Sequence, residues 1–244
     1  MVPRPVAQPR LRLFCFPHAG GAASAYTAWA GDLPDGVELV AVQPPGRERR
    51  FAETPFDRLE PFLDAAYAAL RPLWHLPFAF FGHSTGALVG YELARRLRDD
   101  HAQPPVHLFA SGRWAPHLQD PEPAVHALPR EALVAALRRY GGTPEEVLTH
   151  DELLDLILPL LRADFALGDT YRYTAGPPLE VPITAMGGSS DPRVSEASLN
   201  AWSEHTRGRF ACHLLPGDHF YLHTARHEVI PFISHALQPH NLAG

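Results

Sequence analysis

The chain has 244 residues, with an apolar content of 45% and a charged content of 20%, which is the composition of an ordinary globular protein. Its formal net charge of −6 argues against a nucleic-acid partner, and no run approaches the ~18 apolar residues that cross a membrane. We therefore expect a cytoplasmic protein that binds neither nucleic acid nor a membrane. The two cysteines, Cys15 and Cys212, lie in apolar, strand-like runs, so we expect buried thiols and no disulfide framework.

In the first half of the chain, short apolar runs alternate with helical patterns. Strands are predicted at residues 11–16, 37–43, 77–81 and 106–110. Helices are predicted near 26–29, over 57–73 and over 87–97. In the second of these helices the apolar residues recur at helical spacing, at positions 59, 62, 63, 66 and 70. This alternation predicts an α/β fold with a mostly parallel central sheet flanked by helices.

The second half begins with a long stretch in which we expect no strand, from Trp114 to about Pro178. Helices are predicted there over 130–140 and 153–173, with a capping box and a proline at the first helical position in Thr143–Glu146. Sheet structure resumes with strands at 182–187 and 210–215 and helices over about 195–204 and 224–237. We predict a single domain over 1–244, with a core over 11–114 and 179–244 and a helical lid insertion over about 115–178. The alternative for the insertion is a helical subdomain of structural use only.

The stretch Phe81–Gly86 has the pattern Gly-x-Ser-x-Gly between a predicted strand and a predicted helix. In that context the pattern is typical of a nucleophile, because a sharp turn exposes the serine hydroxyl above the sheet. Gly82 and Gly86 lack the Cβ that would clash in such a turn. The first amides of the following helix also point to the place where negative charge would develop. We predict that Ser84 is a nucleophile.

A serine nucleophile needs a histidine base that is held by a carboxylate, and on an α/β-hydrolase fold the chain order is Ser, then Asp or Glu, then His. His219 follows the last predicted strand in a glycine-containing turn, from which it can reach Ser84, so we predict that it is the base. His83 lies next to the nucleophile and is expected to point away from it.

Asp191 is the predicted carboxylate, because it follows a predicted strand in the turn before the penultimate helix. Asp218 is the rival, although neighbours in sequence rarely orient each other's rings well. Asp164 and Asp169 belong to the predicted lid helix and rank lower.

The glycine-rich turn Pro17–Ala23 ends the first strand. A phosphate cradle is one interpretation, but the Gly-x-Gly-x-x-Gly and Walker patterns are absent. The serine turn favours the other interpretation, an oxyanion loop that brings a backbone N–H close to a substrate carbonyl. We predict that the oxyanion donors are the N–H groups of Thr85 and Ala19, with His18 as the alternative to Ala19.

A second turn, Pro44–Arg50, carries three arginines. It is either a solvated loop or a basic rim that meets an anionic partner. The histidines are scattered without metal-ligand spacing, so we expect no metal and no cofactor.

Seven motifs together resemble the stand-alone type II thioesterases of polyketide and nonribosomal peptide synthesis, in the family's order and over nearly the whole chain. They are Phe16–Ala22, Pro45–Arg47, Phe81–Ala87, Ser111–Arg113, Leu160–Phe165, Gly187–Pro192 and Gly217–Phe220. The resemblance implies hydrolysis of misprimed or decarboxylated acyl groups from the phosphopantetheine arm of an acyl or peptidyl carrier protein. It implies a transient carrier partner, and we expect a monomer.

Two positions depart from the family pattern. Thr85 stands where the family commonly has methionine, which alters the pocket wall but retains the backbone N–H. Asp218 replaces the second glycine of the family's last motif, where it could perturb or orient His219.

Three other functions remain open. One is a general carboxylesterase or lipase, a second is a cyclising or chain-releasing domain that became free-standing, and a third is an inactive hydrolase fold that binds carriers. Because carrier proteins are usually acidic, we expect docking through apolar contact or through a local patch among Arg47, Arg49, Arg50 and Arg113.

Overall fold

The computed structural model describes residues 1–120 and 123–241. In this part of the chain, six strands form one sheet in the order β2-β1-β3-β4-β5-β6, and every neighbouring pair is parallel. The strands are β1 (Leu11–Phe16), β2 (Val37–Ala41), β3 (Phe78–His83), β4 (Leu108–Ser111), β5 (Ile183–Gly188) and β6 (Phe210–Leu215). The expected α/β fold is confirmed, and the sheet is wholly parallel. Each strand coincides with a predicted one to within two residues at either end.

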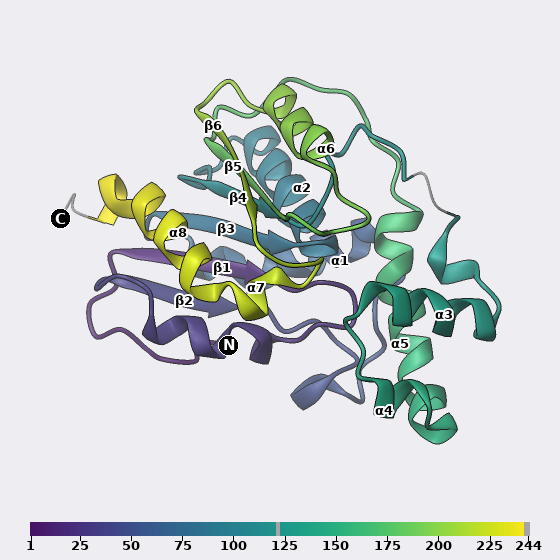
Figure 1. Ribbon diagram of the computed structural model, residues 1–244. Coiled ribbons are helices and arrows are strands. Elements are labelled where there is room, and N and C mark those ends of the chain that lie inside the picture. The colour runs from purple at the N-terminus through teal and green to yellow at the C-terminus, as the bar shows by residue number, and fades with distance from the viewer. Residues whose placement is uncertain (121–122, 242–244) are drawn as a thin grey trace.

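Alternate strand residues face two separate apolar layers, because side chains point to opposite faces of a strand. Phe14 and Phe80 pack in one layer with α1 (Leu59–Leu70) and α2 (Thr85–Asp99). Leu13 packs in the other layer with the 3₁₀ helix η1 (Ala23–Gly31) and with α8 (Arg226–Asn241). Figure 1 shows α2 and α8 on opposite faces of the sheet. The sheet is therefore buried on both faces, as parallel sheets are.

The described residues of the helical insertion, 115–120 and 123–178, lie beside the sheet rather than on either face (Figure 1). The insertion contains α3 (Arg130–Tyr140), α4 (Glu145–Leu148) and α5 (Asp151–Asp169), and its described residues include no strand, as predicted. These helices share an apolar cluster of their own, which includes Leu133 and Leu158. The predicted capping box is wrong in detail: Pro144 occupies the cap position and α4 begins at Glu145, with no side-chain cap.

Further helices follow the last two strands. They are α6 (Glu196–Asn200) with the 3₁₀ helix η5 (Ala201–His205), and α7 (Tyr221–Thr224) before α8. None of the described helices combines the length and the apolarity that a membrane span requires. Because the strands are parallel, the turns after β3, β5 and β6 meet at one edge of the sheet, and these are the turns that carry Ser84, Asp191 and His219.

Candidate active site

Ser84 occupies a strained turn between β3 and α2. Its φ of 54° and ψ of −117° lie in a region that non-glycine residues rarely adopt. Contacts with two neighbouring strands hold this conformation. On the side of β4, the Ser84 N–H donates to the Ser111 carbonyl at 2.8 Å. The chain also passes very close to β1, because a Cβ on Gly86 would lie 2.1 Å from the carbonyl oxygen of Phe16. The predicted sharp turn, and the need for glycine at position 86, are therefore present in the structure.

His219 and Asp191 are joined by a short hydrogen bond, with 2.6 Å between Nδ1 and Oδ2. Both side chains are buried. The other carboxylate oxygen of Asp191 accepts the backbone N–H of Arg193 at 2.9 Å. With Nδ1 donating to the carboxylate, Nε2 of His219 is left as a proton acceptor.

The rival carboxylate is engaged elsewhere. Asp218 is exposed, and its Oδ1 accepts the N–H of Phe220 at 2.8 Å, which stabilises the turn around His219. The geometry therefore pairs Asp191, and not Asp218, with His219. Of the two lower-ranked carboxylates, Asp169 accepts from the backbone and ring of His126.

A cavity of about 260 Å³ brings the separate turns together, because Ser84, His219 and Ala19 all line it. His18, the alternative donor, lines the same cavity. The opposite wall is apolar and comes from the helical insertion. Its side chains are those of Leu137, Val147, Ile157, Leu160, Leu161 and Phe165. The cavity thus has a polar floor at the sheet edge and an apolar wall suited to an alkyl or acyl chain.

Two other histidines near the cavity are held neutral. Burial, with smaller effects of His223, His219 and Arg47, lowers the pKa of His18 to about 3. Burial also lowers the pKa of His83 well below its ordinary value. The centre of the His83 ring lies 5.1 Å from that of the His219 ring, and Nδ1 of His83 lies 2.8 Å from the Ser111 hydroxyl. Among these three rings, only His219 has a carboxylate partner.

Comparison with known proteins identifies the family. The thioesterase domain model matches residues 11–237. The chain belongs to the thioesterase family. It is 44% identical over 229 residues to the gramicidin S biosynthesis protein GrsT of Aneurinibacillus migulanus, covering 94% of this chain and 90% of that protein.

Solved structures agree with this assignment. The type II thioesterase BorB from the borrelidin biosynthetic cluster superposes with a TM-score of 0.88 at 40% identity, covering 97% of this chain and 96% of that one. The thioesterase RedJ from the prodiginine biosynthetic pathway in Streptomyces coelicolor has a TM-score of 0.88 at 39% identity, covering 96% and 95%. The resemblance to type II thioesterases of polyketide and nonribosomal peptide synthesis is thereby confirmed.

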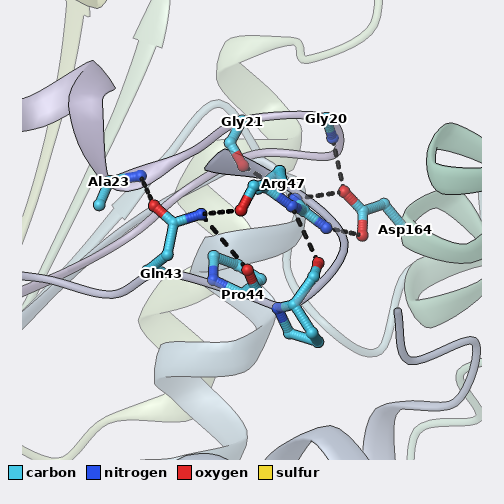
Figure 2. Close-up of polar contacts among 8 residues, drawn as sticks. Gly20, Gly21, Ala23, Gln43, Pro44, Arg47 and Asp164 are labelled. Atoms are coloured by element: carbon cyan, nitrogen blue, oxygen red, sulfur yellow. Dashed lines mark hydrogen bonds and ion pairs between the residues drawn. The ribbon is translucent and has the colours of Figure 1, made fainter. Parts of the chain in front are cut away.

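Arg47 of this thioesterase lies in neither of the predicted settings, since it is only 6% exposed. It is neither in a solvated loop nor on a basic rim. Its guanidinium forms a bidentate ion pair with Asp164 of α5, with both N–O distances at 2.7 Å (Figure 2). Burial raises the pKa of the Asp164 carboxyl, while Arg47 and the N–H of Gly20 oppose that shift. Sequence reasoning missed this pair, although both residues stood in motifs that carried the resemblance.

The other three candidate docking arginines have different surroundings. Arg113 packs over the Trp114 ring, with 4.4 Å from its guanidinium carbon to the ring centre. Arg50 is paired with Glu53. Arg49 is exposed on the surface of the same turn.

Cys15 is buried and Cys212 is half-buried, and both are free thiols. Within residues 1–120 and 123–241 no group of three or more potential ligands could hold a metal ion.

Proposed function

We propose that this thioesterase edits a polyketide or nonribosomal peptide assembly line, hydrolysing aberrant acyl groups from the phosphopantetheine arm of a transiently bound carrier protein. Support comes from its relatives, which are named for gramicidin S, borrelidin and prodiginine biosynthesis. The enzyme itself needs no cofactor, because the substrate brings the phosphopantetheine. We expect a monomer that acts in the cytoplasm.

The chemistry rests on Ser84, His219 and Asp191. Nε2 of His219 takes the proton of the Ser84 hydroxyl as that oxygen attacks the thioester carbonyl. Asp191 holds the imidazole in the tautomer that leaves Nε2 free, through its 2.6 Å bond to Nδ1. The imidazolium then protonates the departing pantetheine thiolate. A water molecule, deprotonated by His219, hydrolyses the acyl-serine and restores the enzyme.

The N–H groups of Thr85 and Ala19 stabilise the oxyanion in this scheme. Thr85 is the first residue of α2, so its N–H has no partner within the helix. Ala19 lines the same cavity as Ser84. Removal of one such donor typically costs about 10²–10³ in kcat.

The helical insertion acts as a lid that shapes the acyl-binding cavity. Six apolar side chains from α3, α4 and α5 form one wall of that cavity. The carrier docks near Arg49 and apolar side chains such as Phe51, which is 60% exposed. Burial of Arg47 removes that residue from the docking surface.

The observation that carries the proposal is the shared cavity, in which Ser84 and a carboxylate-bound His219 face an apolar wall. The test compares hydrolysis of acyl-carrier, acyl-CoA and N-acetylcysteamine thioesters with that of oxygen esters, over a range of chain lengths. We expect thioesters to be preferred, with a chain-length optimum that widens or disappears when the insertion is deleted.

Each rival function has its own outcome in that assay. A strong preference for oxygen esters would indicate a general carboxylesterase or lipase. Cyclised products would indicate a chain-releasing enzyme. A Ser84→Ala variant as active as the parent would refute the acyl-serine mechanism. If the parent itself binds carrier proteins but hydrolyses none of these substrates, it is a carrier-binding module.

A further inference from the structure

The buried ion pair between Arg47 and Asp164 connects two parts of the molecule that are far apart in sequence. Arg47 lies in the turn after β2, and Asp164 lies in α5 of the helical insertion. Their side chains are each 7% exposed, and two N–H groups of Arg47 donate to the two oxygens of Asp164. A planar, two-pronged contact of this kind fixes orientation as well as distance.

The same pair also holds the loop that contains Ala19. Oδ2 of Asp164 accepts the N–H of Gly20 at 2.6 Å, and the Arg47 guanidinium donates to the carbonyl of Gly21 at 2.8 Å (Figure 2). The Gly20 N–H belongs to the peptide unit that directly follows Ala19. Fixing that unit therefore limits the directions in which the Ala19 N–H can point.

Packing reinforces the polar contacts at this point. Gly20 has a φ of +78°, and a Cβ there would lie 2.5 Å from Cδ2 of Leu161, one turn before Asp164 on α5. The loop and the helix are thus in direct contact beside the ion pair as well as through it. On the other side, Gln43 accepts the N–H of Ala23 and donates to the carbonyl of Arg47, which secures the base of the loop (Figure 2).

We propose that the Arg47–Asp164 pair is a positioning device that makes the oxyanion loop depend on the seating of helix α5. When α5 is seated, the loop is held with the Ala19 N–H directed at the reacting carbonyl. When α5 moves away, the Gly20 N–H and the Gly21 carbonyl lose their partners and the donor loses its orientation. This inference rests on the proposed function, because it requires Ser84 as nucleophile and Ala19 as oxyanion donor.

The test uses Asp164→Asn in the full chain, with Asp169→Asn as the matched control. The substitution preserves shape but places an amide N–H₂ against donor groups. Asp169 lies on the same helix and accepts two hydrogen bonds from His126, but it does not contact the loop. With an N-acetylcysteamine thioester, we expect kcat of Asp164→Asn to fall about ten- to a hundredfold with KM nearly unchanged, because the oxyanion contact is made in the transition state.

A trifluoromethyl ketone provides a readout that simple loss of stability would not change. Ser84 adds to its carbonyl carbon, the hydroxyl proton passes to Nε2 of His219, and the ketone oxygen becomes an oxyanion. We expect Asp164→Asn to weaken inhibition by about the same factor as it lowers kcat, and Asp169→Asn to change neither. Equal losses in both variants, or normal kcat and inhibition in Asp164→Asn, would overturn the proposal.

Arg47→Lys keeps the test decisive if Asp164→Asn does not fold. Lysine retains the charge but cannot serve both carboxylate oxygens and the Gly21 carbonyl together, so we expect a smaller fall in kcat with the same parallel loss of inhibition. An unaltered Arg47→Lys variant in that case counts against the proposal. Ser84→Ala distinguishes failure of the proposed function from failure of the positioning role. Activity in Ser84→Ala would refute the proposed function. An inactive Ser84→Ala variant together with a normal Asp164→Asn variant would refute only the positioning role.

Discussion

Asp191→Asn should inactivate the enzyme while leaving its fold intact. In the parent, Oδ1 of Asp191 accepts the N–H of Arg193 at 2.9 Å and Oδ2 accepts from His219 Nδ1 at 2.6 Å. An asparagine keeps the first bond only by placing its oxygen there, which turns its N–H₂ toward the imidazole. Nδ1 must then accept, so the ring proton moves to Nε2 and blocks transfer from Ser84.

The expected loss is about 10⁴ in kcat, the cost of fixing the wrong histidine tautomer in a serine hydrolase, which corresponds to about 5 kcal/mol of transition-state stabilisation. The assay is steady-state hydrolysis of an N-acetylcysteamine thioester near neutral pH, followed through the released thiol. Because substrate contacts are untouched, KM should change little. Circular dichroism and thermal unfolding check that the variant is folded.

Asp218→Asn is the matched control. Asp218 is exposed, and an asparagine oxygen can still accept the Phe220 N–H that Oδ1 accepts now. Substitutions at exposed positions usually change the free energy of unfolding by less than about 0.5 kcal/mol. We expect kcat to stay within about twofold of the parent. The reverse result, with Asp218→Asn inactive and Asp191→Asn active, would refute the assignment of Asp191.

Three further predictions concern the turn at Ser84 and the protonation of a buried histidine. Gly86→Ala should lower the free energy of unfolding by about 3 kcal/mol or more in urea titrations, because its Cβ would lie 2.1 Å from the Phe16 carbonyl oxygen. Thr85→Met should change kcat by less than about tenfold, since the backbone N–H survives, whereas losing a donor costs about 10²–10³. Burial, with a smaller effect of His117, lowers the pKa of His205 from 6.5 to about 4, so the folded protein binds fewer protons than the unfolded chain in that interval. Stability should therefore fall by up to about 3 kcal/mol as the pH drops from 6.5 to 4, and His205→Gln should lose less over the same range.

The fold and the serine turn were predictable because their signals are local. A strand that is buried on both faces has a short, nearly continuous run of apolar residues. All six strands were predicted from such runs, to within two residues at either end. The turn at Ser84 combines a strand, two glycines and a helix within a few residues, so sequence spacing alone defines its geometry. The turns that carry Asp191 and His219 follow strands in the same way, and parallel strands bring such turns to one edge.

Contacts over long sequence separations had no such signal. Arg47 and Asp164 are 117 positions apart in the sequence. Each is a charged residue that, judged from its own segment alone, is expected on the surface. Arginine in a proline- and glycine-rich turn is typical of a surface loop, so burial of Arg47 could be learned only from the packing of α5 against that turn. Charge complementarity between the two motifs was the one available hint.

The environment of Thr85 shows the same limit at the nucleophile itself. Sequence reasoning placed this residue in the wall of the acyl pocket, because it follows Ser84 directly. In the structure Thr85 is 6% exposed and is not among the residues that line the cavity shared by Ser84 and His219. It lines instead a void of about 20 Å³ together with Arg47 and Asp164. A longer side chain at position 85 would therefore enter the void beside the ion pair rather than contact the acyl chain. The change in kcat expected for Thr85→Met, less than about tenfold, should accordingly come without a change in chain-length preference.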